Sequence, residues 1–162
     1  MKKTGVRYIV YSALIAAVYA ALTLAFEPLS YGIMQVRFSE ALSVLPYFTG
    51  TAVPGLFIGC LIANLLGTNG LIDVIVGSLA TLISALIARC IKNRWLVMLP
   101  SVAVNAVMVG AELYFVFERV YSMLYCMLFV GAGQLIACYG LGIPLMLVLD
   151  RYKNRLFPEG LR

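Results

Sequence analysis

Long apolar segments, separated by short breaks rich in polar residues, glycine and proline, make up almost the whole chain. A helix needs about 20 apolar residues to cross the hydrocarbon core of a bilayer, so a chain of this length allows at most about six crossings. The pattern predicts a single all-α transmembrane domain over residues 1–162. Its six predicted helices cover residues 8–26, 39–50, 53–66, 71–91, 95–117 and 121–149.

The composition is that of an integral membrane protein. Hydrophobic residues make up 63% of the chain and charged residues 12%, and the mean hydropathy is +0.99. Soluble domains, by contrast, are about half apolar and about a quarter charged. Few residues remain between the predicted helices, and we therefore expect no soluble catalytic domain beside them.

The net charge of +5 comes from basic residues that cluster in the breaks between apolar segments. This distribution indicates membrane topology rather than nucleic-acid binding, because cytoplasmic loops carry an excess of Lys and Arg. On the predicted layout ten of the twelve basic residues face the cytoplasm, as do both termini, and only Arg37 and Arg119 face outward. The acidic residues at or toward the outer side are Glu27, Glu40, Asp73, Glu112 and Glu118.

The first predicted helix carries a stripe of small side chains, since Ala13, Ala17 and Ala21 recur every four residues. Such a stripe allows another helix to approach closely. Two interpretations stay open at this point. The stripe is either a docking face for another protein or a packing face within the chain's own bundle.

A long external segment from Glu27 to Phe38 follows this helix, because Pro28 disfavours helical backbone at the residue before it. Loops of this length in a compact protein usually have a function. We expect the segment to act as a lid over a bound ligand, with Tyr31 and Phe38 supplying aromatic faces; simple surface exposure of both rings is the alternative. Ser39 is then expected to cap the next helix, with Glu40 at its first position.

Polar residues within and between the predicted helices define a candidate binding site. Asn105 and Glu112 are seven residues apart and share one helix face, and Gln134 lies at a depth similar to that of Asn105. An ionisable residue inside a membrane span usually has a partner or a ligand. The candidate substrate-binding residues are Arg37, Glu40, Asn64, Asp73, Asn105, Glu112 and Gln134. The structural alternative is that the amides join helices and the acids complement helix dipoles.

No motif for catalysis or for ATP hydrolysis is present. The chain has no histidine, no CxxC pair among its four cysteines, no GxxxxGK[ST] phosphate-binding loop and no GxSxG motif. We therefore expect that the protein is not an enzyme and that it has no cofactor and no metal site. We expect the cysteines to be small buried hydrophobic residues. A polar pocket without a catalytic base indicates a binding subunit that obtains its energy from partner proteins.

Three features carry a resemblance to a known family: the VRFSEAL segment followed by Leu45 and Pro46, the NLLG turn leading into IDVIVGSLAT, and the alanine stripe. With them the chain resembles the S components of energy-coupling factor (ECF) vitamin transporters, and specifically the QueT group for queuosine precursors. The resemblance implies a compact bundle of six helices in the bacterial plasma membrane, with substrate bound from outside beneath the first and third external loops.

The resemblance also implies partners and a substrate. The face formed by Ala13, Ala17 and Ala21 would dock onto a transmembrane coupling subunit driven by two ATPase subunits. The candidate polar residues would surround a 7-deazaguanine, such as the aminomethyl precursor or queuine. The sequence leaves two other functions open, namely an S component for a different small vitamin and a structural membrane subunit without a ligand.

Overall fold

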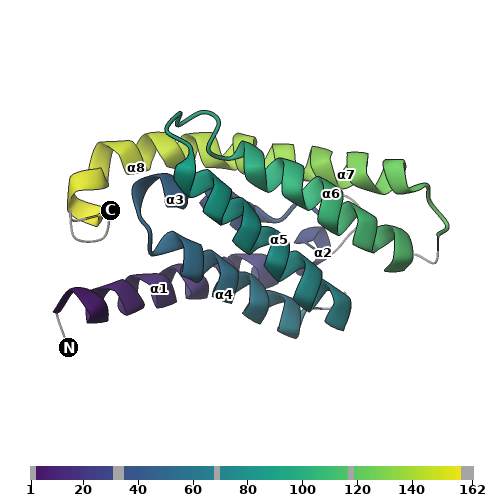
Figure 1. Cartoon of the computed structure of the whole chain (residues 1–162), viewed down its shortest axis with the longest axis horizontal. Coiled ribbons are helices and arrows are strands. Elements are labelled where there is room, and N and C mark those ends of the chain that lie inside the picture. Colours follow the sequence, from purple (N-terminus) through teal and green to yellow (C-terminus); the bar gives the residue numbers. More distant parts are fainter. Residues whose placement is uncertain (1–2, 31–34, 68–69, 117–118, 158–162) are drawn as a thin grey trace.

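The computed structural model describes residues 3–30, 35–67, 70–116 and 119–157, which form an elongated bundle of helices (Figure 1). Its elements are α1 (Lys3–Ala25), α2 (Glu27–Ser30), η1 (Phe38–Val44), α3 (Leu45–Phe48), α4 (Ala52–Leu66), α5 (Leu71–Cys90), α6 (Leu99–Val116), α7 (Met123–Leu135), η2 (Ile136–Leu141) and α8 (Gly142–Leu156). The element η1 is a 3₁₀ helix and η2 is a π helix. No strand occurs in these ranges, and the predicted all-α class is confirmed.

Helices α1 and α4 pack together through glycine. A Cβ atom placed on Gly55 would lie 2.8 Å from Ile15 Cβ, and one placed on Gly59 would lie 2.7 Å from Tyr19 Cβ. Both distances are too short for a real contact, so only glycine lets the two backbones approach this closely. The face of α1 that packs inward is buried, and it comprises Ser12, Ile15, Ala16, Tyr19, Ala20 and Thr23.

The alanine stripe lies on a different face of α1. Ala13, Ala17 and Ala21 are all exposed, so the described part of the chain does not cover them. No described helix of this bundle therefore packs on the stripe, and its use as a docking face stays a prediction.

The segment from η1 to the turn after α3 forms the centre of the bundle. At one end the hydroxyls of Ser39 and Thr23 share a hydrogen bond of 2.6 Å. At the other end the Tyr8 hydroxyl donates to the Gly50 carbonyl at 3.0 Å. The segment therefore runs antiparallel to α1. A 3₁₀ helix rises about 2.0 Å per residue against about 1.5 Å in an α-helix, so few residues suffice to follow α1 over this length.

Elements α7, η2 and α8 form one continuous helical run from Met123 to Leu156. Within this run the π helix η2, which contains Gly140, has hydrogen bonds that span five residues; Gly142 and Pro144 follow it in α8.

Some predicted boundaries and environments are wrong. Ser39 does not cap a helix; it lies inside η1, after Arg37 at the N-cap, and bonds to Thr23. The predicted external loop contains a helical turn, α2. Helix α6 begins at Leu99 and not at residue 95, because Pro100 suits the second helical position, where its missing N–H is not needed. The last helix continues past residue 149 to Leu156, and Cys90 is exposed rather than buried.

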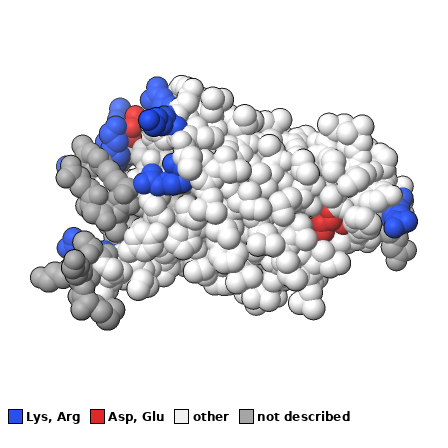
Figure 2. Space-filling view, in the orientation of Figure 1, with Lys and Arg blue, Asp and Glu red and all other residues white. Residues whose placement is uncertain are grey.

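Four of the described helical segments are long and apolar enough to cross a membrane: Gly5–Ala25, Leu71–Cys90, Leu99–Val116 and Met123–Lys153. The shorter helix α4 is also apolar. Lys and Arg gather at the end of the molecule where α1 begins and α8 ends, and most of the visible surface between the two ends is uncharged (Figure 2). Such an uncharged belt suits contact with lipid, where charged side chains are costly.

Candidate functional site

The seven predicted substrate-binding residues all lie inside the bundle, with exposed fractions between 0% and 5%. They come from the segment before η1 and from η1, α4, α5, α6 and α7. Burying polar groups is unfavourable unless each finds a hydrogen-bond partner or a ligand. The partners of each residue therefore indicate which groups are structural and which are left for a ligand.

An ion pair between Arg37 and Asp73 forms one part of the site. Arg37 Nη2 lies 2.8 Å from Asp73 Oδ2, and Arg37 Nε donates to the Ser30 carbonyl at 3.2 Å. Asn64 Nδ2 donates to the Asp73 carbonyl at 2.9 Å. Asp73 lies in the first turn of α5, where a carboxylate complements the helix dipole. The groups meet over Gly77, since a Cβ there would lie 2.6 Å from Asp73 Oδ1 and 2.7 Å from Asn64 Nδ2.

Glu40 and Gln134 form a second part of the site. The Tyr19 hydroxyl donates to Glu40 Oε1 at 2.5 Å. Cys138 Sγ lies 3.6 Å from the Glu40 carbonyl oxygen and 3.6 Å from Gln134 Oε1. The Glu40 backbone N–H donates to the Arg37 carbonyl at 3.0 Å, which joins the two parts. Glu40 is therefore a buried group held by Tyr19, and it lies in the first turn of η1, as expected for the start of this helical segment.

Glu112 differs from the other two buried acids. Neither of its carboxyl oxygens has a hydrogen-bond partner in the described chain. Its helix α6 packs on α5, the helix that carries Asp73, since Val109 and Leu113 of α6 share a buried cluster with Ala80 of α5. Asn105 lies two turns away on α6, is also buried, and has an amide nitrogen without a partner. Native proteins seldom leave buried groups unpaired in this way, so these atoms are candidates for contact with a ligand or ordered water.

Sequence reasoning missed several groups that touch the site, among them Tyr19, Gln35, Cys60 and Thr81. The Cys60 sulfur accepts from Thr81 Oγ1 at 3.2 Å and from Asn64 Nδ2 at 3.5 Å, so the residue is buried as predicted but in polar surroundings. A signal was available for Tyr19, whose hydroxyl falls in the middle of an apolar helix. No such signal was available for Cys60, because a cysteine within an apolar helix is ordinarily a small core residue.

The segment predicted to act as a lid is described only in part. Tyr31 lies outside the described residues. Phe38 packs edge-to-face against Phe26, with ring centroids 4.4 Å apart, and is half-buried rather than free at the surface. Gln35 and Arg37 are buried. Within the described ranges the end of this segment is thus anchored in the bundle, and its role over a ligand stays a prediction.

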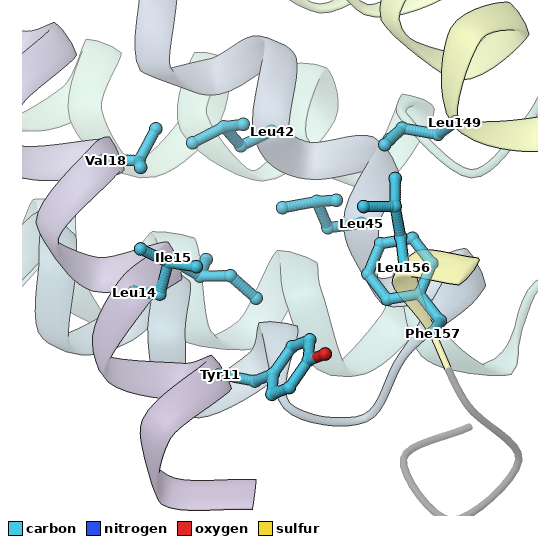
Figure 3. Close-up of a pocket in the computed structure, with 9 residues that line it drawn as sticks. All are labelled: Tyr11, Leu14, Ile15, Val18, Leu42, Leu45, Leu149, Leu156 and Phe157. Atoms are coloured by element: carbon cyan, nitrogen blue, oxygen red, sulfur yellow. The ribbon is translucent and has the colours of Figure 1, made fainter. Parts of the chain in front are cut away.

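A separate pocket of about 220 Å³ lies between α1 and α8 (Figure 3). Its lining residues are Tyr11, Leu14, Ile15, Val18, Leu42, Leu45, Leu149, Leu156 and Phe157. Apart from the Tyr11 hydroxyl these side chains offer no donor or acceptor to orient a polar ligand. The buried polar cluster is therefore the better candidate site for a polar substrate. In the described ranges no group of three or more Cys, Asp and Glu residues is placed to hold a metal ion.

Comparisons with known proteins give two findings. A family model described as QueT transporter matches residues 9–151. The queuosine precursor transporter QueT of Lactococcus lactis subsp. cremoris is 40% identical over 85 residues, which are 51% of this chain and 50% of that protein. The match thus spans about half the length of this curated relative. No solved structure matches the chain.

Proposed function

Because the chain belongs to the QueT transporter family, we propose that it is the substrate-binding S component of an ATP-driven ECF importer for a queuosine precursor. Membership of a transporter family means that the protein is not an enzyme, and its long apolar helices make it a multi-pass protein of the cell membrane. The proposed substrate is a 7-deazaguanine, such as the aminomethyl precursor, captured from outside the cell.

The observation that carries this proposal is the buried, unpartnered carboxyl group of Glu112. Asp73 is engaged by Arg37 and Glu40 by Tyr19, which leaves Glu112 for a ligand. A 7-deazaguanine presents a ring N–H beside an exocyclic amine, and one carboxylate accepts both donors. The two unpartnered oxygens of Glu112 suit this two-donor edge. The cationic amine of the aminomethyl form would pair with a second acid, Asp73 or Glu40.

The neutral amides supply the rest of the proposed recognition. Asn64, Asn105 and Gln134 are buried, and the amide nitrogen of Asn105 has no partner in the described chain. These groups would read the carbonyl and the ring nitrogens of the substrate. An analogue that lacks one such group leaves a buried polar atom unpaired, which costs about 1 to 3 kcal/mol.

The proposed partners follow from the exposed face of α1. Ala13, Ala17 and Ala21 are small and uncovered, while the opposite face of α1 packs on α4. Small side chains permit close approach of a partner helix. We assign this face to a transmembrane coupling subunit driven by two ATPase subunits, because the chain itself carries no phosphate-binding loop.

The proposed topology has six crossings with both termini in the cytoplasm. Four crossings are the long apolar segments. The other two are α4 and the buried segment from η1 to α3, which runs antiparallel to α1. The cluster of basic residues at the end where α1 begins and α8 ends supports a cytoplasmic position for that end (Figure 2).

A thermal-shift screen of the purified chain tests the proposed function. The panel contains 7-deazaguanines, including the aminomethyl precursor, and unrelated vitamins. A ligand at 100 times its dissociation constant adds about 2.7 kcal/mol to the free energy of unfolding, so the 7-deazaguanines should raise the melting temperature and the vitamins should not. Stabilisation by an unrelated vitamin alone would assign a different substrate. A folded protein that no compound stabilises would contradict the proposed function.

A further inference from the structure

We propose that Gln35 is a specificity residue of the same site, and that its side-chain amide donates a hydrogen bond to the carbonyl oxygen of the bound heterocycle. The inference rests on the proposed function. It adds a residue that the sequence pattern did not select, because Gln35 falls in a segment expected to be an external loop.

The first argument is the burial of an unpaired donor. The Gln35 side chain is 1% exposed, and its Nε2 atom has no hydrogen-bond partner in the described chain. A primary amide nitrogen carries two N–H donors. Leaving them buried and unpaired is unfavourable, and native proteins seldom do so where no ligand or ordered water is bound.

The second argument is the backbone at this position. Gln35 has φ +43°, and among the described residues Arg119 is the other non-glycine residue with positive φ. A side chain makes this left-handed conformation unfavourable, and glycine or asparagine adopts it more readily. A long side chain retained at a strained position is typical of residues that contact ligands.

The third argument is location. The Arg37 N–H donates to the Gln35 carbonyl at 3.0 Å. Arg37 is in turn fixed by the Ser30 carbonyl and by Asp73. The backbone of Gln35 is therefore held two residues from Arg37, whose buried ion pair with Asp73 joins this segment to α5. Helix α5 in turn packs on α6, the helix that carries Glu112.

The unpaired atoms of the site complement one another in chemistry. Glu112 offers two acceptors, whereas Gln35 and Asn105 each offer an amide nitrogen that can donate. This set fits a planar ligand whose donors and acceptors lie side by side. On a 7-deazaguanine the carbonyl oxygen is next to the ring N–H, so a carboxylate and an amide donor can read adjacent atoms.

The test uses two variants and two ligands. Gln35→Met removes the donor at similar length, and Gln35→Glu replaces the donor with an acceptor. Each purified protein is titrated with 7-aminomethyl-7-deazaguanine and with its thio analogue, in which sulfur, a weak acceptor, replaces the carbonyl oxygen and the neighbouring ring N–H is kept. Arg119→Met is the matched control, because Arg119 also has positive φ (+64°) but is exposed.

Wild-type protein should prefer the carbonyl ligand about tenfold, which corresponds to about 1.4 kcal/mol. Both Gln35 variants should lose most of this preference while binding the thio analogue within twofold of wild type, and Arg119→Met should change neither affinity. If Gln35→Met does not fold, Gln35→Glu gives the same comparison.

Several outcomes would overturn the inference. Wild-type protein that binds both ligands equally, or Gln35 variants that keep the preference, would overturn it while leaving the proposed function intact. Equal weakening of both ligands would show a structural role and overturn it as well. Wild-type protein that binds neither ligand would overturn the proposed function together with the inference.

Discussion

Replacement of Gly77 by alanine should displace the buried polar groups of Asp73 and Asn64 that pack against this position. A Cβ at this position would lie 2.6 Å from Asp73 Oδ1 and 2.7 Å from Asn64 Nδ2. Both groups must move, and the 2.9 Å bond from Asn64 to the Asp73 carbonyl and the 2.8 Å Arg37–Asp73 pair are strained or lost. The change adds one methyl group and removes no polar group.

The expected magnitude follows from opposing terms. Alanine inside a helix is favoured over glycine by about 1 kcal/mol. Against this, overpacking a buried site costs about 1 to 3 kcal/mol, and loss of one hydrogen bond costs about 1 kcal/mol. Displacing Asp73 from Arg37 adds part of the roughly 3 to 5 kcal/mol that a broken buried pair costs. We expect a net loss of about 2 to 4 kcal/mol in the free energy of unfolding.

Thermal unfolding in detergent and ligand titration measure the effect. Gly140→Ala is the matched control, because a Cβ at Gly140 meets no atom within 4 Å, and this variant should be at least as stable as wild type. Gly77→Ala should lower the melting temperature and weaken binding of the 7-deazaguanine. If Gly77→Ala is as stable as Gly140→Ala and binds ligand normally, the described arrangement of Asp73 and Asn64 is wrong.

Other substitutions test separate parts of the account. Ala17→Leu should abolish substrate uptake in cells but leave ligand binding by the isolated protein intact, because Ala17 is exposed on the proposed docking face. Loss of ligand binding as well would contradict the assignment of this face to a partner. Gly59→Ala should destabilise the protein by about 1 to 3 kcal/mol, because its Cβ would lie 2.8 Å from the Ala16 carbonyl oxygen, and an unchanged melting temperature would refute the close α1–α4 packing. Tyr19→Phe removes the 2.5 Å bond to Glu40 and should lower the free energy of unfolding by about 1.5 to 3 kcal/mol; denaturant unfolding at wild-type stability would show that this bond is not important.

Much of the helical layout is predictable from the sequence because it depends on local properties. The apolar segments that became α1, α4 and α5 are bounded by charged residues, proline or glycine. The ends of α4 and α5 agree with the prediction to within one residue, whereas α1 begins five residues earlier, at Lys3. The segment that became η1 and α3 lacks such signals. It is buried on nearly all sides, so its sequence shows no clear period, and its 3₁₀ backbone could not be inferred.

The sequence allowed the candidate residues to be selected, but not their arrangement to be predicted; their role in binding stays a prediction. Polar residues such as Asn105 and Glu112 stand out in an apolar sequence, and all seven candidates are buried. The pairing of Arg37 with Asp73 joins residues 36 positions apart, and no local pattern specifies it. Gln35 was missed because a glutamine in an apparent loop is ordinarily solvated.

The most direct test of the binding site is the affinity of a Glu112→Gln variant for two ligands, the aminomethyl precursor and its uncharged nitrile relative. The variant keeps the side chain's shape but replaces one acceptor oxygen with a donor. If the Glu112 carboxylate binds the guanine edge that both ligands share, the variant should bind both ligands at least about tenfold more weakly than wild type. Asp150→Asn is the control, because Asp150 pairs with Lys153 at the opposite, basic end of α8, and it should change neither affinity. A loss of affinity confined to the cationic ligand would show that Glu112 contacts the amine and not the guanine edge. If Glu112→Gln leaves both affinities within twofold of wild type, the proposal that this buried carboxyl binds the substrate is contradicted.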